Sequence, residues 1–107
     1  MLIILMVVDM VKQEQLAQVL KALADPTRLQ ILAMLKRPGC CSMGPKGGLC
    51  ACDIEGQLKL SQPTISHHMK VLREAGLVDA EKIGQWMWYR RNEAAMKQLA
   101  KTMESAV

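Results

Sequence analysis

The chain has 107 residues, a formal charge of +4 and a sequence pI near 9.0. This length fits a single domain, residues 1–107, whose modest core would gain from oligomerisation. The basic charge mildly favours a polyanionic partner such as nucleic acid, and the apolar start MLIILMVV is far shorter than the roughly 20 residues that cross a bilayer. The start also lacks the basic region and cleavage site of a signal peptide, so we expect a cytoplasmic protein with no membrane partner.

Residues 1–10 form an N-terminal extension that has two interpretations. The segment is a strand or a turn of helix that packs on a neighbour, or translation naturally begins at Met10. From Val11 to Ala24, apolar residues recur at helical spacing among polar ones, which predicts a helix. The apolar stripe of this helix consists of Leu16, Val19, Leu20 and Leu23.

The dipeptide Asp25-Pro26 separates this helix from a second one. Asp is a good N-cap, and Pro suits the first helical position because its missing N–H would be unpaired there anyway. We predict that the second helix runs from Pro26 to about Lys36. Its buried stripe is expected to comprise Leu29, Leu32 and Leu35.

An inserted loop, residues 38–52, holds all four cysteines of the chain: Cys40, Cys41, Cys50 and Cys52. Residues 38–48 are rich in glycine and proline, which is typical of a loop. In a reducing compartment, clustered thiols favour ligands or redox sensors over structural disulfides. A short helix should follow, roughly from Asp53 to Lys59, with Ile54 and Leu58 pointing inward.

A fourth helix is predicted from Gln62 to Ala75. Ser61 suits its N-cap, and Gly76 ends it in the usual C-terminal manner. Its core stripe consists of Ile65, Met69 and Leu72.

The end of the chain predicts a hairpin and a last helix. Two strand-like segments, Leu77–Lys82 and Gln85–Arg91, flank a tight turn around Ile83-Gly84. A final helix should run from Asn92 to about Glu104. The fold class is therefore mainly α with a β-hairpin, a winged helix-turn-helix with about five helices and a two-stranded wing.

The polar face of the helix Gln62–Ala75 is typical of a helix that reads DNA. Hydrogen-bonding side chains of short or medium length contact base edges in the major groove, and here they are Gln62, Thr64, Ser66, His67, His68 and Lys70. Exposed N–H groups near Ser61 and Thr64 also favour a phosphate. Because adjacent helical residues point about 100° apart, the two histidines are a poor chelating pair, and we interpret them as facing DNA or partly packed. Phosphate contacts are expected from Arg28, Lys82, Arg90 and Arg91.

Two functions of other classes are alternatives to DNA binding. No glycine-flanked nucleophile, acid pair or phosphate loop is present in the sequence, so we do not expect an enzyme. A thiol metal-binding chaperone would explain the cysteines but not the winged-helix segment. Binding to DNA without metal distinguishes a DNA-binding protein from such a chaperone.

Three segments closely resemble the ArsR/SmtB family of bacterial metal-responsive repressors. LSQPTISHHMKVLREAGLV, residues 60–78, resembles the recognition-helix segment of the family, and LADPTRLQIL, residues 23–32, resembles its second helix. LCACD, residues 49–53, resembles the cysteine motif at the start of its third helix. The resemblance covers nearly all of residues 11–100 and points to the arsenic-sensing type.

The resemblance implies a homodimeric repressor on a palindromic, double-stranded operator, released when a toxic metal or metalloid binds. It implies that the first and last helices form the dimer interface. It also implies that one set of residues faces DNA: Ser61, Gln62, Thr64, Ser66, His67 and Lys70.

The chain departs from the family pattern in three places. Arsenic-sensing members often carry a third cysteine three residues after the Cys-x-Cys pair, where this chain has Glu55. Zinc-sensing members place Asp and His ligands on the last helix, whereas residues 92–107 contain neither residue type, so that site is expected to be absent. The Cys40-Cys41 pair in an enlarged glycine-rich loop is not part of the common pattern.

The four thiols suggest a metalloid inducer. Trivalent arsenic or antimony is soft and takes three sulfurs, so arsenite or antimonite would bind Cys50, Cys52 and either Cys40 or Cys41. A four-sulfur site for zinc or cadmium, a three-sulfur site for lead, a disulfide redox sensor and a zinc-stapled loop without a sensing role remain alternatives. No organic cofactor is expected.

Overall fold

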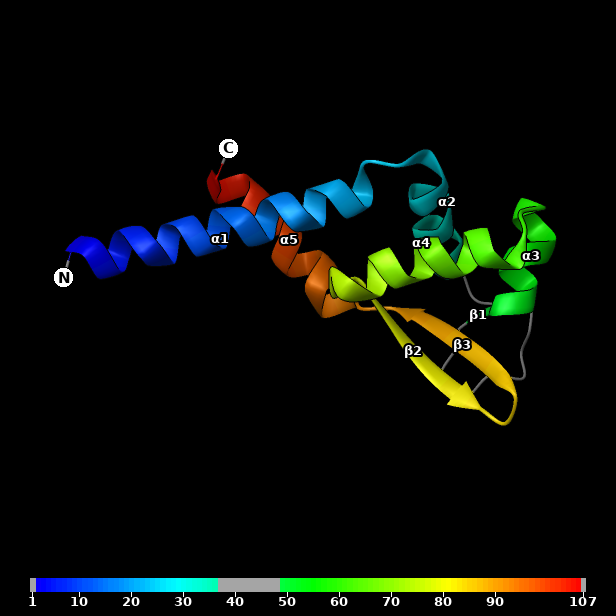
Figure 1. Ribbon diagram of the computed structural model, residues 1–107. Helices are drawn as coiled ribbons and strands as arrows, with labels where there is room; N and C mark the ends of the chain where they lie inside the picture. The colour runs from blue at the N-terminus through cyan, green and yellow to red at the C-terminus, as the bar shows by residue number, and fades with distance from the viewer. Residues whose placement is uncertain (1, 37–48, 107) are drawn as a thin grey trace.

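A computed structural model describes residues 2–106 except 37–48 (Figure 1). The order of elements is α1 (Leu2–Leu23), α2 (Pro26–Lys36), β1 (Leu49–Cys50), α3 (Ala51–Leu58), α4 (Gln62–Glu74), β2 (Val78–Ile83), β3 (Trp86–Arg91) and α5 (Glu93–Ala106). This arrangement confirms the predicted class of helices plus a hairpin wing. The predicted ligands Cys40 and Cys41 lie outside the described residues.

The helix ends lie where the sequence supplies caps. The Asp25 carboxylate accepts a hydrogen bond from the backbone N–H of Arg28 at 3.0 Å, at the start of α2. Asn92 does the same for the N–H of Ala95 at 3.0 Å, at the start of α5. Helix α3 begins two residues earlier than the predicted Asp53, because Asp53 accepts a hydrogen bond from the N–H of Cys50 at 3.3 Å and so belongs to the first turn.

The sheet has three strands, in the order β1-β3-β2, and all pairs are antiparallel. The hairpin register pairs Ile83 with Trp86, leaving a two-residue turn in which Gly84 has φ = 62°. A glycine adopts this left-handed backbone conformation without steric cost. The third strand, β1, was not predicted: Leu49 pairs with Tyr89, and Cys50 pairs with Trp88.

The core lies where α2, α3 and α4 pack on one another and on the sheet. The predicted stripe of α4 is confirmed, since Ile65, Met69 and Leu72 are at most 2% exposed. One predicted core position is wrong. Leu29 is 52% exposed, whereas Ile31, Leu32 and Leu35 are buried. The inward face of α2 is therefore rotated relative to the i, i+3, i+6 stripe that the leucine pattern indicated.

Helix α1 begins at Leu2, so the apolar N-terminal extension is helical and continuous with the predicted helix Val11–Ala24. The N-terminal half of α1 projects well beyond the rest of the molecule (Figure 1). Within residues 2–36 and 49–106, no helix is both long enough and apolar enough to cross a membrane.

Candidate nucleic-acid interface and thiol site

Helix α4 presents one buried face and one exposed polar face. Opposite its core stripe, six of the predicted DNA-contacting residues are exposed: Ser61, Gln62, Thr64, Ser66, His67 and Lys70. Helix α3 and the turn 59–61 precede α4, and the β2–β3 hairpin follows it, so the elements have the order of a winged helix-turn-helix. The structure therefore brings these six residues together on one surface.

Ser61 caps the N-terminus of this helix. Its Oγ accepts a hydrogen bond from the backbone N–H of Thr64 at 3.4 Å and lies 2.8 Å from Thr64 Oγ1. A capped N-terminus with exposed hydroxyls also offers N–H groups and a positive dipole end to a phosphate. Ser61 and Thr64 thus stabilise the start of α4 while remaining accessible.

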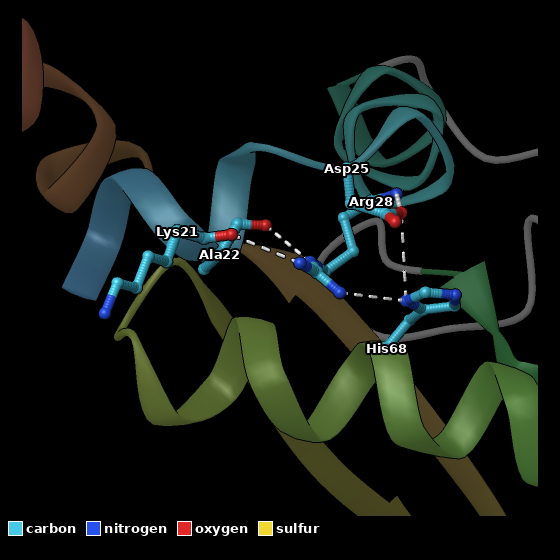
Figure 2. Close-up of polar contacts among 5 residues, drawn as sticks. All are labelled: Lys21, Ala22, Asp25, Arg28 and His68. Atoms are coloured by element: carbon cyan, nitrogen blue, oxygen red, sulfur yellow. Dashed lines mark hydrogen bonds and ion pairs between the residues drawn. The ribbon is translucent and has the colours of Figure 1, made fainter. Parts of the chain in front are cut away.

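His68 differs from its neighbour His67, because it points inward toward α2 (Figure 2). Its side chain is only 14% exposed, and its Nδ1 lies 3.3 Å from Arg28 Nη1 and 3.9 Å from Asp25 Oδ2. The alternative that this histidine is partly packed therefore describes it better than a DNA-facing position.

Arg28 connects three helices. Its Nε donates to the carbonyl of Ala22 at 2.6 Å, and its Nη2 donates to the carbonyl of Lys21 at 3.1 Å (Figure 2). These carbonyls belong to the last turn of α1, where carbonyls lack the usual partner four residues on; that of Lys21 also accepts from the backbone N–H of Ala24 at 3.3 Å. A cation is favourable at that end of the helix dipole. The guanidinium of Arg28 is therefore hydrogen-bonded to backbone carbonyls of its own chain. Its predicted phosphate contact stays a prediction.

The same cluster affects the acidity of Asp25. The backbone N–H of Arg28 holds the pKa of the Asp25 carboxyl below its usual value, and the charge of the Arg28 guanidinium acts in the same direction. Asp25 therefore stays ionised beside Arg28 and His68 at neutral pH. Sequence reasoning identified Asp25 as a helix cap but missed its place in this cluster.

The basic side chains of the wing differ in the ion pairs and hydrogen bonds that they make. Lys82 is exposed on β2. Arg90 lies within 3.6 Å of Glu81 on the neighbouring strand. Arg91 is held at the base of the wing: its Nη1 donates to the carbonyl of Leu32 at 3.4 Å, and its Nε lies 3.0 Å from Glu93 Oε1. Of the three, Lys82 is the one with no ion pair or hydrogen bond to another described side chain.

The thiol pair lies at the junction of β1 and α3. Cys50 is buried, Cys52 is exposed, and their sulfurs are 2.9 Å apart, with Cys52 donating to Cys50. This hydrogen bond, followed by desolvation and the charge of Cys50, raises the pKa of the Cys52 thiol to about 11. The pair therefore retains a proton at neutral pH. Both sulfurs lie close enough together to bind one soft centre, given metal–sulfur bonds of about 2.3 Å.

The pair is attached to two DNA-binding elements at once. Cys50 is the residue before α3, the first helix of the helix-turn-helix, and it also pairs with Trp88 of the wing. The neighbouring Tyr89 is 7% exposed, and burial raises the pKa of its hydroxyl. Sequence reasoning connected the thiols to α3 but missed the wing, because a two-residue strand has no detectable periodicity.

The described residues do not complete a metal site. Within residues 2–36 and 49–106, no cluster of three or more His, Cys, Asp or Glu side chains is arranged to hold a metal ion. Among these residues, Cys50 and Cys52 are a pair of thiols and not a set of three or four ligands.

Comparison with known proteins identifies a family with this sequence and fold. The family of bacterial regulatory proteins named arsR matches residues 25–80. An arsenical resistance operon repressor of Staphylococcus aureus is 39% identical over 84% of this chain and 78% of its own length. A homolog of the cadmium resistance regulatory protein CadC from the same species is 33% identical over 85% of this chain and 70% of its own length.

A solved structure supports the same assignment. The homodimeric winged helix-turn-helix DNA-binding domain of a possible ArsR-family regulator from Mycobacterium bovis has a TM-score of 0.66 and is 29% identical. The similarity covers 88% of this chain and 80% of that one. The relatives are transcriptional regulators and not enzymes, as the sequence predicted. With its exposed recognition helix, its wing and these relatives, the chain belongs to the arsR family of bacterial regulatory proteins.

Proposed function

We propose that this protein is a homodimeric repressor that leaves a palindromic operator when arsenite or antimonite binds Cys50, Cys52 and a third thiol, Cys40 or Cys41. One observation carries the proposal: two thiols with sulfurs 2.9 Å apart lie at the start of the helix-turn-helix. The homodimeric relative and the arsenical repressor support it.

Proton release on binding distinguishes a metalloid from a divalent cation. Arsenite is arsenous acid, As(OH)₃, at neutral pH. Three thiols condense with it to form three As–S bonds, and each thiol proton leaves with a hydroxide as water. No net proton is released. A divalent cation binds thiolates, so it releases thiol protons, including the one that Cys52 donates to Cys50.

The attachment of Cys50 suggests how the inducer acts on DNA binding. Drawing Cys50 and Cys52 toward a third sulfur would shift the start of α3 and also strain the pairing of Cys50 with Trp88. Helix α3 positions α4, and β3 carries the wing. The two recognition helices of the dimer would then no longer match two successive major grooves, and the wings would shift as well. Inducer binding and DNA binding would thus be linked by a coupling free energy.

The decisive experiment follows operator binding by fluorescence anisotropy while arsenite, antimonite, cadmium, lead or zinc is added to the reduced protein. We expect release by arsenite and antimonite at about one per subunit, with zinc inert, as a trithiolate site requires. Proton release, measured in weak buffer, should be near zero for arsenite.

Cysteine variants test the ligand set in the same assay. Cys50→Ser and Cys52→Ser should bind the operator normally but resist the inducer. Cys40→Ser and Cys41→Ser identify the third ligand, because only the essential one should abolish release. Normal release from a Cys50→Ser/Cys52→Ser double variant would refute the mechanism.

Other outcomes assign the alternatives. The cadmium-resistance relative supports a divalent inducer as the second candidate. Release by cadmium or lead alone, with protons liberated, would establish it. Release by an oxidant alone would establish a redox sensor, and failure to bind DNA without metal would favour a thiol chaperone.

A further inference from the structure

Three helices meet at one cluster of polar side chains, formed by Asp25, Arg28 and His68 (Figure 2). Asp25 caps α2, Arg28 lies in the first turn of α2, and His68 lies on α4. The last turn of α1 adds the backbone carbonyls of Lys21 and Ala22, which accept hydrogen bonds from Arg28. Arg28 contacts every other member, so it links α1 to the recognition helix.

The contact between Arg28 and His68 fixes which nitrogen of the imidazole carries the proton. A guanidinium only donates hydrogen bonds, because it has no acceptor. His68 Nδ1, 3.3 Å from Arg28 Nη1, therefore accepts this hydrogen bond and carries no proton. The other candidate contact, from His68 Nδ1 to Asp25 Oδ2, is 3.9 Å long and exceeds hydrogen-bond distance. The cluster thus fits a neutral His68 with its proton on Nε2.

The charged groups around His68 come from three helices. On α2, Asp25 and Arg28 face it with opposite charges. On α4, the ring of the exposed His67 lies 5.8 Å away, from centroid to centroid. On α1, Lys21 contacts the cluster through its carbonyl, while its ammonium group points away (Figure 2). Among the described residues, no charged side chain of α3 or of the sheet pairs with His68.

Protonation of His68 would exchange its partner. A proton on Nδ1 removes the acceptor that Arg28 uses and leaves two cations side by side. The same proton makes Nδ1 a donor toward Asp25, which stays ionised because the backbone N–H of Arg28 lowers the pKa of its carboxyl. Imidazole is the side chain whose charge ordinarily changes between about pH 5 and 8. Mild acid would therefore release α4 from Arg28 and, through Arg28, from α1.

We propose that Arg28 and His68 are positioning residues for operator binding: they hold the recognition helix at a fixed orientation to α1, and only neutral His68 makes this link. This role rests on the proposed binding to an operator and does not depend on the thiol site. The two recognition helices of a dimer must match successive major grooves. A link that orients α4 therefore acts on specific binding, and not on the general attraction of a basic protein to phosphates.

The first test measures operator and random DNA binding by fluorescence anisotropy, at constant ionic strength, from about pH 7.5 to 5.5. We expect the affinity of the wild type for its operator, relative to random DNA, to fall about tenfold as His68 gains a proton. His68→Asn should remove this fall, because asparagine Oδ1 is bonded to Cγ as histidine Nδ1 is, accepts from Arg28 and does not titrate. His67→Asn is the matched control on the same helix and should retain the fall.

Salt dependence separates a positioning role of Arg28 from a phosphate contact. At neutral pH, Arg28→Ala should weaken operator binding about tenfold and leave the slope of log affinity against log salt unchanged. A slope reduced by about 0.9 would assign Arg28 a phosphate contact and overturn the inference. Circular dichroism checks that the variant folds, and the result for His68→Asn stands without it.

NMR of the imidazole nitrogens gives a readout that a purely structural role would not move. It should place the proton of His68 on Nε2 in neutral solution. A proton on Nδ1, a pH-independent operator affinity in the wild type, or an equal fall in His68→Asn would overturn the inference while leaving operator binding intact. A wild type that binds no operator at any pH would overturn both.

Discussion

Helix α4 and the first ten residues of α1, Leu2–Val11, which we call the apolar arm, are helical segments of similar length, but one is largely buried on its apolar side and the other is exposed. Helix α4 has few large apolar residues, yet Ile65, Met69 and Leu72 are almost completely buried. The arm is apolar at nine of ten positions, yet none of these nine side chains is buried. The two segments show that spacing, rather than the amount of hydrophobic surface, decides what one chain can bury.

The physical reason is the number of sides of the helix that are apolar. An apolar stripe repeating every three or four residues faces one side, and one neighbouring layer covers it. A helix that is apolar on all sides needs neighbours on all sides, which a 107-residue chain does not supply. The stripe of α4 is therefore covered within one protomer, whereas the start of α1 leaves its apolar surface exposed.

The largest expected effect is on the free energy of unfolding, from a substitution in the buried stripe of α4. Leu72→Ala removes a side chain with no exposure and should cost about 2–5 kcal/mol of the free energy of unfolding. Leu5→Ala at the start of α1 should destabilise mainly where the protein is dimeric, because Leu5 is 62% exposed in the protomer and has little burial to lose there. Urea denaturation at several protein concentrations measures both. A concentration-independent loss for Leu5→Ala would mean that the arm packs within its own chain.

A smaller effect separates two arginines. Arg28 connects α1, α2 and α4 through partly buried hydrogen bonds, so Arg28→Ala should cost about 1.5–3 kcal/mol. Arg90→Ala should cost less than about 1 kcal/mol, because its only described ion pair is long and partly exposed. Thermal denaturation checks both. Equal losses would show that the cluster around Arg28 adds nothing beyond an ordinary surface ion pair.

Lys82 and Arg91 should differ in how much they contribute to the salt dependence of DNA binding. If Lys82 contacts a phosphate, Lys82→Ala should reduce the slope of log affinity against log salt by about 0.9. Arg91→Ala should leave the slope unchanged and lower stability instead, since its guanidinium is bound to Leu32 and Glu93. Anisotropy titrations on operator DNA at several salt concentrations measure the slopes. A reduced slope for Arg91→Ala alone would reverse the assignment.

The smallest expected effect concerns pH. The pKa of the Cys52 thiol is raised from 9.0 to about 11, so its proton stabilises the folded state below pH 9 and this stability is lost as pH rises through 11. Cys52→Ser should therefore lack part of the loss that the wild type shows between pH 9 and 11. Because Tyr89 titrates in both proteins, the difference isolates Cys52. Parallel curves would mean that the thiol hydrogen bond does not persist in solution.

The sequence predicted the elements with a strong local signal. Helix α4 has an N-cap, a regular stripe and a terminal glycine, and its predicted bounds agree with the structure to one residue. The hairpin and the last helix were also predicted. The spacing of leucines in α2 was misleading, because Leu29 and Ile31 compete for the inward position and only packing decides between them.

The candidate site was predictable in type but less so in detail. Residue types identified the recognition face and the thiol pair. They could not show that Arg28 and Arg91 are held by backbone carbonyls of other elements, since those contacts join residues far apart in the chain. They could not show the pairing of Cys50 with Trp88 for the same reason.

The short strand β1 has a consequence for how such a regulator evolves. Leu49 is fixed by its pairing with Tyr89, and α2 is anchored by the buried Leu35, so residues 37–48 connect two points whose positions the rest of the fold determines. Each doubling of such a connection costs only about 0.6 kcal/mol in loop-closure entropy. Insertions there can add or remove thiols while the recognition helix stays the same. Under the proposed function, a change in the number of thiols between these two points would change the inducer and leave the DNA-contacting residues of α4 as they are.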